Sequence, residues 1–308
     1  MSLGVLVGID LRLTMSKNKY RVIGFVVLFN PPNDVIQNIL SYLGQVDLLY
    51  AVDNSDLECA GFLRQLAELD TVRYLDNRGN PGLAHALNRG IRAAMQEGAD
   101  FVLMMDQDGR AQPEMVARMM AVLDEISIDK IGIVSPFHLT MLSPSPPVVH
   151  WQTVLSTMSS GNLLRVEAYH RAGPFMEELF LDYVDNEYCL RLRQCGFLII
   201  RVNNALLEHK IANLTISRIL GWEIVHLNYL PIRWYYISRN CCYVFPKYWG
   251  AFPGTLALHG FFIIKHALFS LIFERCRWLR IKMIARGCRD YWSNRLGKFQ
   301  GNESPYKG

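Results

Sequence analysis

A run of apolar residues, Phe101-Val102-Leu103-Met104-Met105, ends abruptly at Asp106-Gln107-Asp108-Gly109. A short, continuously apolar run is typical of a strand buried on both faces, as in a parallel sheet covered by helices. Ligands of open α/β sheets bind just beyond the carboxyl ends of such strands. Because residues i and i+2 of an extended segment point the same way, the carboxylates of Asp106 and Asp108 can face one divalent ion. The alternative is an acidic turn that caps a following helix, whose start is indicated by Pro113.

Strand-like and helix-like segments alternate along the chain before this run. The strand-like segments cover residues 22–29, 46–52 and 72–75, and the helical spacings cover residues 34–43, 57–69 and 83–96. Turn-forming residues separate them at regular intervals. This alternation predicts an α/β fold with a doubly wound, mainly parallel sheet that starts near the N-terminus.

Polar residues follow the first three predicted strands, namely Asn30, Asp53 and Asn77. Turn formation would explain Asn77 and Gly79 singly, because both residue types tolerate positive φ. It does not explain why polar groups close three successive strands. The loop that holds Gly79 and Gly82 has neither a Gly-x-Gly-x-x-Gly pattern nor a Gly-Lys-Ser/Thr ending, which argues against a standard dinucleotide or nucleoside-triphosphate loop.

A second acidic segment contains Asp182, Asp185 and Glu187 and leads into a helical pattern that ends near Gly196. Acids in the first turn of a helix are stabilised by its dipole, so simple capping is the alternative to a functional role. Upstream, small polar residues that include Gly161 and Asn162 interrupt an apolar stretch. We assign Gly161, Asn162 and Asp182 to an acceptor or donor pocket.

The motifs, in order, resemble those of one known family. They are Asn-Pro after the first strand, Val-Asp-Asn-Ser, Asn-x-Gly, Asp-Gln-Asp, and Val-Asp-Asn-Glu-Tyr-Cys-Leu-Arg followed, after four intervening residues, by Gly. Together they resemble the family 2 glycosyltransferases of GT-A fold, a Rossmann-like α/β architecture. Within that family the chain is most similar to bacterial rhamnosyltransferases of O-antigen and capsular polysaccharide synthesis. The resemblance spans residues 22–248.

The resemblance implies a role for individual residues. Asp53, with Asn30 nearby, would hold the nucleotide base and ribose, and Asn77 and Asn88 would line the donor pocket. In the Asp-Gln-Asp motif, Asp106 would contact the ribose and sugar, beside Gln107, and Asp108 would bind Mg²⁺ or Mn²⁺. Asp185 would act as the general base, and His209 would complete the metal site, although a lone histidine is as often structural.

Two departures from the family pattern qualify this comparison. Val184 stands where the family usually has an acid before the base, and Asp182 is the nearest substitute. Arg233-Trp234 is preceded by Leu230 where the Gln-x-x-Arg-Trp motif of processive synthases has glutamine. We therefore expect transfer of a single sugar rather than polymer synthesis.

The implied activity is an inverting, metal-dependent transfer of a sugar from a nucleotide-diphosphate donor, with dTDP-rhamnose suggested by the resemblance, to a saccharide acceptor. A UDP- or GDP-sugar donor is the alternative within the family. A nucleotidyltransferase would need a Gly-rich, Lys- or Arg-bearing loop after the first strand, which Asn30-Pro31-Pro32-Asn33 does not provide. A non-catalytic membrane-associated scaffold has no need of Asp106, Asp108 and Asp185 together.

Positive charge is concentrated at the C-terminus. Residues 275–308 contain nine lysines and arginines against two acids, a net charge of +7 within a total of +4, so the preceding residues carry a net charge of −3. This distribution argues against a nucleic-acid-binding body and for a basic end that meets an anionic surface.

Residues 255–273 are strongly apolar but contain His259, Lys265 and His266. A lysine at the centre of a spanning helix costs roughly 2.5–3.5 kcal/mol on an insertion scale, so we expect a helix that lies in the membrane interface. The following segment mixes Trp278, Trp292 and other apolar residues with arginines, as basic amphipathic anchors do. The alternative is a helix packed on the catalytic domain or in a dimer interface.

These features predict an N-terminal extension over residues 1–20, a glycosyltransferase domain over residues 21–248 and a helical, basic amphipathic region over residues 249–308. The nucleotide-binding half would end near residue 142, and the acceptor half would follow. Seven cysteines without a Cys-x-x-Cys pair, and a start that lacks the pattern of a secretory signal, predict a reduced, cytoplasmic protein. We expect it at the cytoplasmic face of the inner membrane, with a lipid-linked saccharide acceptor and a homo-oligomer as further expectations.

Overall fold

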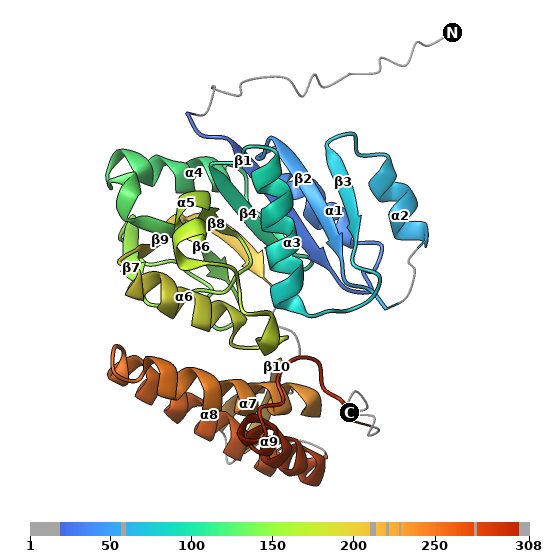
Figure 1. The fold of residues 1–308 in the computed structure, drawn as a ribbon, viewed down its shortest axis with the longest axis vertical. Helices are drawn as coiled ribbons and strands as arrows, with labels where there is room; N and C mark the ends of the chain where they lie inside the picture. Colours follow the sequence, from blue (N-terminus) through green and yellow to red (C-terminus); the bar gives the residue numbers. More distant parts are fainter. Residues whose placement is uncertain are drawn as a thin grey trace.

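The computed structural model describes residues 19–56, 60–209, 214–219, 222–227, 229–273 and 276–301. The expected N-terminal extension falls almost wholly outside these residues. So do the first three residues of the helix expected over residues 57–69, and the two ends of the basic segment 275–308. Figure 1 shows a sheet with helices on both faces above a separate layer of helices from the C-terminal third.

The first half of the chain alternates strands and helices as expected. Its elements are β1 (Val22–Leu28), α1 (Val35–Leu43), β2 (Leu48–Asp53), α2 (Ala60–Ala67), β3 (Val72–Asp76), α3 (Leu83–Gln96) and β4 (Phe101–Asp106). The four strands are parallel and lie in the order β3-β2-β1-β4. The predicted doubly wound α/β fold is confirmed for this half.

The parallel register brings the polar strand ends to one edge of the sheet. Leu28 of β1 pairs with Asp53 of β2, and Val27 pairs with Asp106 of β4. Asp53 in turn pairs with Asp76 at the end of β3. The carboxyl ends of all four strands are therefore level, as the sequence pattern required.

Burial of β1 and β4 alternates between the two faces of the sheet. In β4, Phe101, Leu103 and Met105 pack with α1, α2 and α4, whereas Val102 and Met104 pack with α3, α5 and α6. Because each strand has apolar neighbours on both sides, its sequence is continuously apolar. The apolar run over residues 101–105 was predicted to be a strand buried on both faces, and this prediction is confirmed.

The second half of the domain is mixed in direction. Its elements are β5 (Gly109–Ala111), α4 (Met115–Ala121), the short 3₁₀ turns Val122–Asp124 and Ile128–Lys130, β6 (Ile131–Leu139), β7 (Trp151–Val154), β8 (Asn162–Arg165), α5 (Val166–Ala172), the 3₁₀ turn Glu177–Leu179, α6 (Val184–Gln194) and β9 (Leu198–His209). β8 runs antiparallel between β4 and β6, and β9 is parallel to β6 but antiparallel to β5 and β7.

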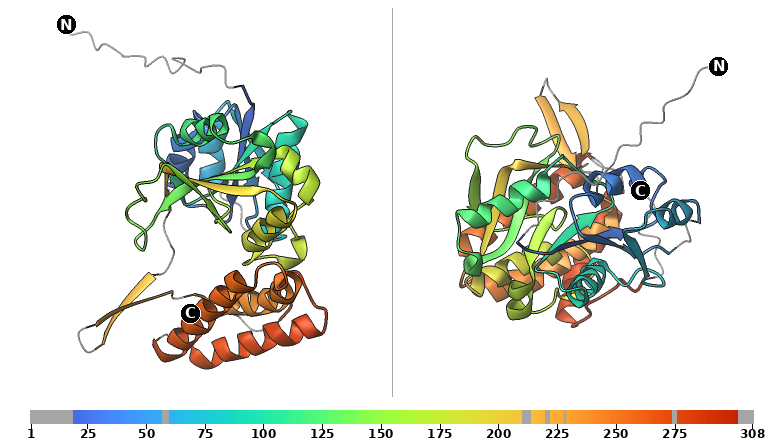
Figure 2. Two further views of the ribbon diagram at one scale, coloured as in Figure 1. Left: turned by 90° about the vertical axis from the view of Figure 1, so that its left-hand side faces the viewer. Right: turned by 90° about the horizontal axis from the view of Figure 1, so that it is seen from above.

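The C-terminal third adds a hairpin and three helices: β10 (Leu214–Ile219), β11 (Trp222–Leu227), α7 (Pro231–Tyr248), α8 (Pro253–Phe273) and α9 (Arg277–Trp292). In Figure 2 the hairpin projects to one side of the molecule. The sequence analysis predicted the apolar helix and the basic helix but neither the hairpin nor the short strands β5 and β7.

The basic helix α9 packs against α7 inside the protein. Met283 is fully buried between the two helices, and Arg280 and Asp290 are nearly so. At Gly287 an added Cβ would overlap Ser238 and the carbonyl oxygen of Tyr235, so only glycine permits this close approach. Met283, an apolar residue of the segment that was expected to anchor a membrane, is therefore part of the protein core.

A buried ionic cluster joins α6 to α7. The Glu187 carboxylate is inaccessible to solvent and accepts bonds from Arg191 Nη2 at 2.8 Å, Lys247 Nζ at 3.1 Å and the Tyr248 hydroxyl at 2.6 Å. A buried carboxylate is tolerated when cations and hydrogen-bond donors compensate its lost hydration. This cluster therefore fixes the helical layer against the helix that begins at Val184.

We predict that Glu187→Gln lowers the free energy of unfolding by about 1.5–3 kcal/mol, because the fully buried side chain loses the charge that its three hydrogen-bond donors stabilise. Chemical denaturation measures this change. Glu114→Gln is the matched control, since Glu114 pairs with Arg118 at 3.0 Å on the surface and its loss should cost at most ~1 kcal/mol. Equal effects of the two substitutions would show that the buried cluster does not join the layers.

Candidate active site

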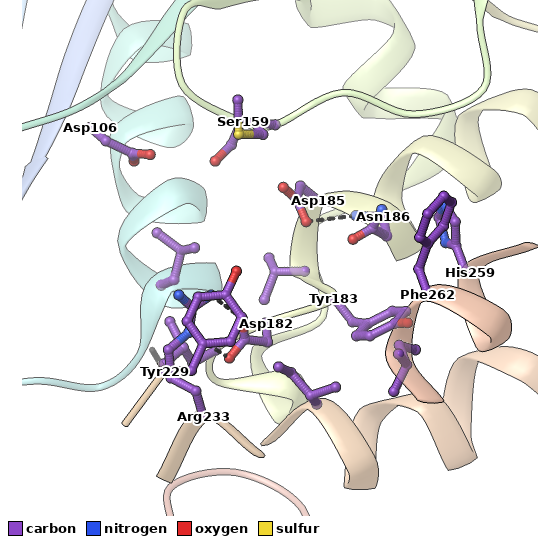
Figure 3. Close-up of a pocket in the computed structure, with 16 residues that line it drawn as sticks. Asp106, Ser159, Asp182, Tyr183, Asp185, Asn186, Tyr229, Arg233, His259 and Phe262 are labelled. Atoms are coloured by element: carbon purple, nitrogen blue, oxygen red, sulfur yellow. Dashed lines mark hydrogen bonds and ion pairs between the residues drawn. The ribbon is translucent and has the colours of Figure 1, made fainter. Parts of the chain in front are cut away.

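A cavity of about 420 Å³ lies between the carboxyl edge of the sheet and the C-terminal helices. Three acids from distant parts of the chain line it: Asp106 at the end of β4, and Asp182 and Asp185 before and within the first turn of α6. In Figure 3, Asp106 and Ser159 lie on one side, and His259 and Phe262 of α8 on another. The structure thus brings both acidic segments of the sequence into one site.

The loop before β8 positions Asp106. The Asp106 backbone N–H donates to Ser160 Oγ at 3.2 Å, and the Gly161 N–H donates to the Met104 carbonyl oxygen at 2.7 Å. Gly161 has φ +82°, and a Cβ there would come within 2.7 Å of Pro136 Cγ, so its role is to let the loop pass close to the sheet. Asn162 is buried and donates to the Met158 carbonyl oxygen at 2.7 Å. Neither residue is among those lining the cavity.

The loop that precedes α6 positions Asp185. Phe180, Asp182 and Tyr183 all have φ near +60°, a conformation that costs free energy for residues other than glycine. The Asn240 side-chain amide of α7 lies within hydrogen-bonding distance of the carbonyl oxygens of Leu179, Leu181 and Asp182, at 2.8–3.0 Å. These contacts hold the strained loop, and the helix that follows it presents Asp185 to the cavity.

Asp182 forms an ion pair with Arg233 of α7. The guanidinium Nε lies 3.3 Å from Asp182 Oδ2, and Nη2 bonds to Oδ1. The guanidinium carbon lies 4.1 Å from the centroid of the Tyr229 ring, which fixes the orientation of the pair. Asp182 is therefore neutralised by a partner, whereas the Asp185 carboxylate accepts backbone N–H groups, that of Asn186 at 2.8 Å, and forms no ion pair among the described residues.

Two carboxyl groups of the cavity have raised pKa values. Burial is the main cause for Asp185, whose pKa rises to about 6; Asp182 raises it further, while the Asn186 N–H and Arg233 lower it. Burial, with the charges of Asp108 and Asp185, raises the pKa of Asp106 to about 7. A carboxylate with a pKa near neutrality is a better proton acceptor than one with an ordinary value, so Asp185 suits general-base chemistry.

Asp108 and His209 lie together beside this cavity. β5 pairs with β9 so that Gly109 is opposite His209, and His209 Nδ1 lies 3.6 Å from Asp108 Oδ1. His209 Nδ1 is buried and has no hydrogen-bond partner among the described residues. No group of three or more His, Cys, Asp or Glu side chains that could hold a metal occurs in that part of the chain. The two donors fit a divalent ion that takes its other ligands from a bound diphosphate.

The residues expected to hold the nucleotide lie along the same sheet edge. The Asp53 carboxylate accepts the Ser55 N–H at 2.8 Å and the Tyr74 hydroxyl at 2.7 Å. Asn77 donates from Nδ2 to Asn54 Oδ1 at 2.5 Å. Asn30 is exposed at the end of β1, with its N–H donating to Ser55 Oγ at 2.8 Å. These groups are close in space, although several already bond to one another.

Gln107 and Asn88 have structural contacts that the sequence did not reveal. Gln107 Oε1 accepts the Phe29 N–H at 2.8 Å, and its Nε2 donates to the Phe29 carbonyl oxygen, so the side chain ties the loop to β1. Asn88 is buried in α3 and bonds to the backbone of Phe175 and to Glu177 and Tyr169. Neither lines the cavity.

The helical layer supplies functional candidates that the sequence analysis missed. Tyr229 and Arg233 line the cavity from the start of α7, and His259 and Phe262 line it from α8. Arg233 was visible in the sequence only as part of an incomplete Gln-x-x-Arg-Trp motif. Ser160 was visible only within a run of small polar residues. No sequence pattern connected Arg233 or Ser160 with the acidic residues of the cavity.

Comparisons with known proteins agree with this geometry. Residues 25–143 match the model of the family "Glycosyl transferase family 2". The chain is 27% identical over 281 residues to the dTDP-rhamnosyl transferase RfbF of Shigella flexneri, covering 84% of this chain and 87% of that protein.

Two solved structures share the fold at low sequence identity. GalNAc-T7 with UDP, GalNAc and Mn²⁺ aligns with a TM-score of 0.58 and 12% identity, covering 90% of this chain and 56% of that chain. TarS of S. aureus aligns with a TM-score of 0.51 and 13% identity, covering 89% of this chain and 44% of that chain. This chain thus spans about half the length of each, and the likeness concerns the fold alone.

The motif order, the sheet with its acidic edge and the family match therefore agree, and the resemblance noted in the sequence is confirmed. Residues 25–143 match the family 2 glycosyltransferase model, and the chain has a GT-A-like α/β fold with a C-terminal helical region.

Proposed function

We propose that the protein transfers one L-rhamnose unit from dTDP-rhamnose to a saccharide acceptor in cell-surface polysaccharide synthesis, with inversion at the anomeric carbon. The choice of sugar and base is supported by the similarity to the protein named dTDP-rhamnosyl transferase, which extends over most of both chains. A UDP- or GDP-sugar remains the alternative donor. The nucleotide requirement is tested by measuring whether dTDP, UDP or GDP binds to the protein in the presence of Mn²⁺.

The convergence of Asp106 and Asp185 on one cavity carries this proposal. The two residues are 79 positions apart in the sequence, yet the charge of Asp185 contributes to the raised pKa of Asp106. A transfer reaction needs such proximity, because the donor sugar and the base that activates the acceptor must meet at one carbon atom.

Direct displacement follows from this arrangement. The acceptor hydroxyl gives its proton to a carboxylate oxygen of Asp185 while its oxygen bonds to the anomeric carbon. The bond from that carbon to the β-phosphate oxygen breaks, and the nucleoside diphosphate leaves with the bonding electron pair. Attack from the side opposite the leaving group inverts the configuration. Asp182 and Arg233 act as a positioning pair that keeps the loop and the first turn of α6 in place.

Asp108 and His209 would hold Mg²⁺ or Mn²⁺ in this proposal. A divalent ion there would supply Lewis-acid stabilisation of the negative charge that grows on the leaving diphosphate. Asp53, Asn77 and Asn30 would face the nucleoside from the ends of β2, β3 and β1.

We further propose that the protein works at the cytoplasmic membrane surface on a lipid-linked acceptor. By length and composition, residues Pro253–Ile272 of α8 could cross a membrane. However, Leu256 and Ser270 are buried and His259 lines the cavity, which favours a helix lying along the surface. Leu258, Phe261, Ile264, Leu268 and Ile272 recur every three or four residues, and each is more than half exposed.

Exposed cations flank this apolar stripe. Lys265 lies on α8 itself, and Arg277 and Lys282 lie on α9. An apolar stripe beside cations is the pattern of a helix that binds anionic lipid from one side. The same helix lines the active-site cavity through His259 and Phe262, so a membrane-borne acceptor would be near the base.

The first test concerns Asp185 as the base. Its pKa of about 6 lies above the usual value for aspartate, and only the ionised form accepts a proton. We therefore expect kcat/KM for sugar transfer to fall as the pH drops below about 6. Asp185→Asn should lower kcat on the order of 10²–10⁴-fold while dTDP binding in the presence of Mn²⁺, measured by calorimetry, stays normal.

The same substitution should not destabilise the fold at pH 7.5. When folding raises the pKa of a carboxyl group, the folded state loses stability as the pH rises. For Asp185 the loss begins near pH 4, the pKa in the unfolded chain, and continues through about pH 6, the pKa in the folded protein. Asparagine avoids that loss, so the unfolding midpoint should be unchanged or higher. Normal turnover by Asp185→Asn would remove Asp185 from the base role.

The metal site is tested by titrating dTDP with and without Mn²⁺. Asp108→Asn and His209→Ala should each weaken Mn²⁺-dependent binding by roughly 10–100-fold, the loss expected for one charge-assisted contact of about 1.5–3 kcal/mol. Glu208→Gln is the control, because Glu208 neighbours His209 but bonds to Gln112 instead. Mn²⁺-dependent binding that survives both site substitutions would place the ion elsewhere.

The membrane proposal is tested by sedimentation with vesicles that contain phosphatidylglycerol. Replacing Phe261, Ile264 and Leu268 together by serine should reduce bound protein at least on the order of 100-fold, since each buried side chain contributes ~1.5–3 kcal/mol. Serine at Met141, Val148 and Val149, which are equally exposed on the loop after β6, should leave partitioning unchanged. Unaltered binding by the α8 variant would contradict the proposal.

A further inference from the structure

A second cavity, of about 430 Å³, lies on the other side of Asp185. Met158, Asp185 and Asn186 line both cavities, so the candidate base stands at their common wall. The second cavity lies over β6 and β9, in the half of the sheet away from the nucleotide-facing strands β1, β2 and β3. A molecule bound there could present a group to Asp185 without displacing one in the first cavity.

Arg201 of β9 contributes a positive charge to this second cavity. Its Nε donates to Asn203 Oδ1 at 3.1 Å, and the Asn203 amide in turn donates to the Val149 carbonyl oxygen at 2.8 Å. The guanidinium carbon lies 5.3 Å from the centroid of the Phe137 ring. Contacts on two sides therefore fix the orientation of the guanidinium.

Arg201 has no acidic partner among the described residues, whereas Arg233, the other arginine in the linings of these two cavities, pairs with Asp182. Burial lowers the pKa of Arg201, and no neighbouring charge offsets that effect. The group nevertheless stays charged, because the pKa of an arginine begins above 12. A fixed, half-buried cation without a counter-ion is suited to an anionic ligand, which its planar donors can bind in bidentate fashion.

Apart from Asp185 at the shared wall, the other polar side chains of the lining carry hydroxyl, amide or imidazole groups. His138 bonds through Nε2 to the Ser160 carbonyl oxygen at 2.7 Å. Hydroxyl groups of Thr140, Ser143 and Ser156 complete the polar surface. Hydroxyls and an amide can hydrogen-bond to the hydroxyl groups of a sugar.

We propose that the second cavity is the acceptor subsite and that Arg201 binds an anionic substituent of the acceptor saccharide, either a phosphoryl group or a carboxylate. This inference rests on the proposed transfer reaction and adds the chemical class of its acceptor. The sugar hydroxyl groups contact Ser143, Ser156 and Asn186. The attacking hydroxyl reaches Asp185 at the shared wall while the anion lies on Arg201, which fixes which hydroxyl is presented.

The test uses protein saturated with dTDP and Mn²⁺, so that the donor's diphosphate site is already filled. N-acetylglucosamine 1-phosphate, glucuronic acid and N-acetylglucosamine are then titrated by calorimetry as phosphoryl, carboxylate and neutral probes. We expect one or both anions to bind and the neutral sugar to bind at least about tenfold more weakly. The probe that binds identifies which anion the acceptor carries.

Substitutions assign the effect to Arg201. Arg201→Gln should weaken binding of the anionic probe at least about tenfold, and Arg201→Lys should retain part of the affinity because it keeps the charge but loses the planar fork. Arg171→Gln is the matched control: Arg171 also stacks on a phenylalanine, 4.8 Å from the Phe197 ring centroid, but lies outside the cavity, and its loss should leave binding unchanged.

Four results would overturn this inference. They are equal binding of neutral and anionic probes, wild-type affinity in Arg201→Gln, absence of any anion binding, and anion binding that disappears once dTDP and Mn²⁺ are present. The last would assign Arg201 to the donor's diphosphate. Failure of dTDP and Mn²⁺ to bind wild-type protein would instead contradict the proposed transfer reaction, so the two failures are distinguishable.

Discussion

The contact between α7 and the loop before α6 determines much of this active site. Arg239 is fully buried and donates to the carbonyl oxygens of Leu179 at 2.9 Å and Gly297 at 2.6 Å, while Asn240 bonds to three carbonyl groups of the same loop. The loop contains three residues with φ near +60°, which an isolated peptide would adopt rarely. The helical layer therefore provides the bonds that hold the loop and, through it, Asp185.

This dependence explains why the C-terminal helices belong to the catalytic unit. Arg233 pairs with Asp182, Tyr248 and Lys247 bond to Glu187, and His259 lines the cavity that contains Asp185. A GT-A-like sheet alone would offer the acids of β4 but would leave the start of α6 without support. In the proposed function, the same helices also carry the membrane-facing stripe, so acceptor delivery and base positioning depend on one layer.

The sequence was informative where burial imposes a simple pattern. β1 and the first five residues of β4 are apolar throughout because both faces of each strand are covered, and the polar residues at the strand ends lie level because the strands are parallel. The pattern was uninformative where pairing is distant. The antiparallel strands β5, β7 and β8 have three or four residues each, and nothing local specifies which strands they or the hairpin strands β10 and β11 pair with.

The site shows the same division between local and distant information. Asp106, Asp108 and Asp185 could be nominated because acids at strand and helix ends are visible in the sequence. The contacts of Gln107 with Phe29 and of Asn88 with Phe175 could not be predicted. In a sequence, a polar side chain that has a structural role looks the same as one that binds a ligand. Likewise, Arg233 lies 51 residues from Asp182, and only the packing of α7 brings them together.

The most direct measurement is a crystal structure of the protein with dTDP-rhamnose and Mn²⁺, in which anomalous scattering locates the metal. We predict Mn²⁺ bound to Asp108, His209 and the diphosphate, with the anomeric carbon facing the cavity between Asp106 and Asp185. Metal or diphosphate bound away from Asp108, or a sugar that faces away from Asp185, would contradict the proposed reaction.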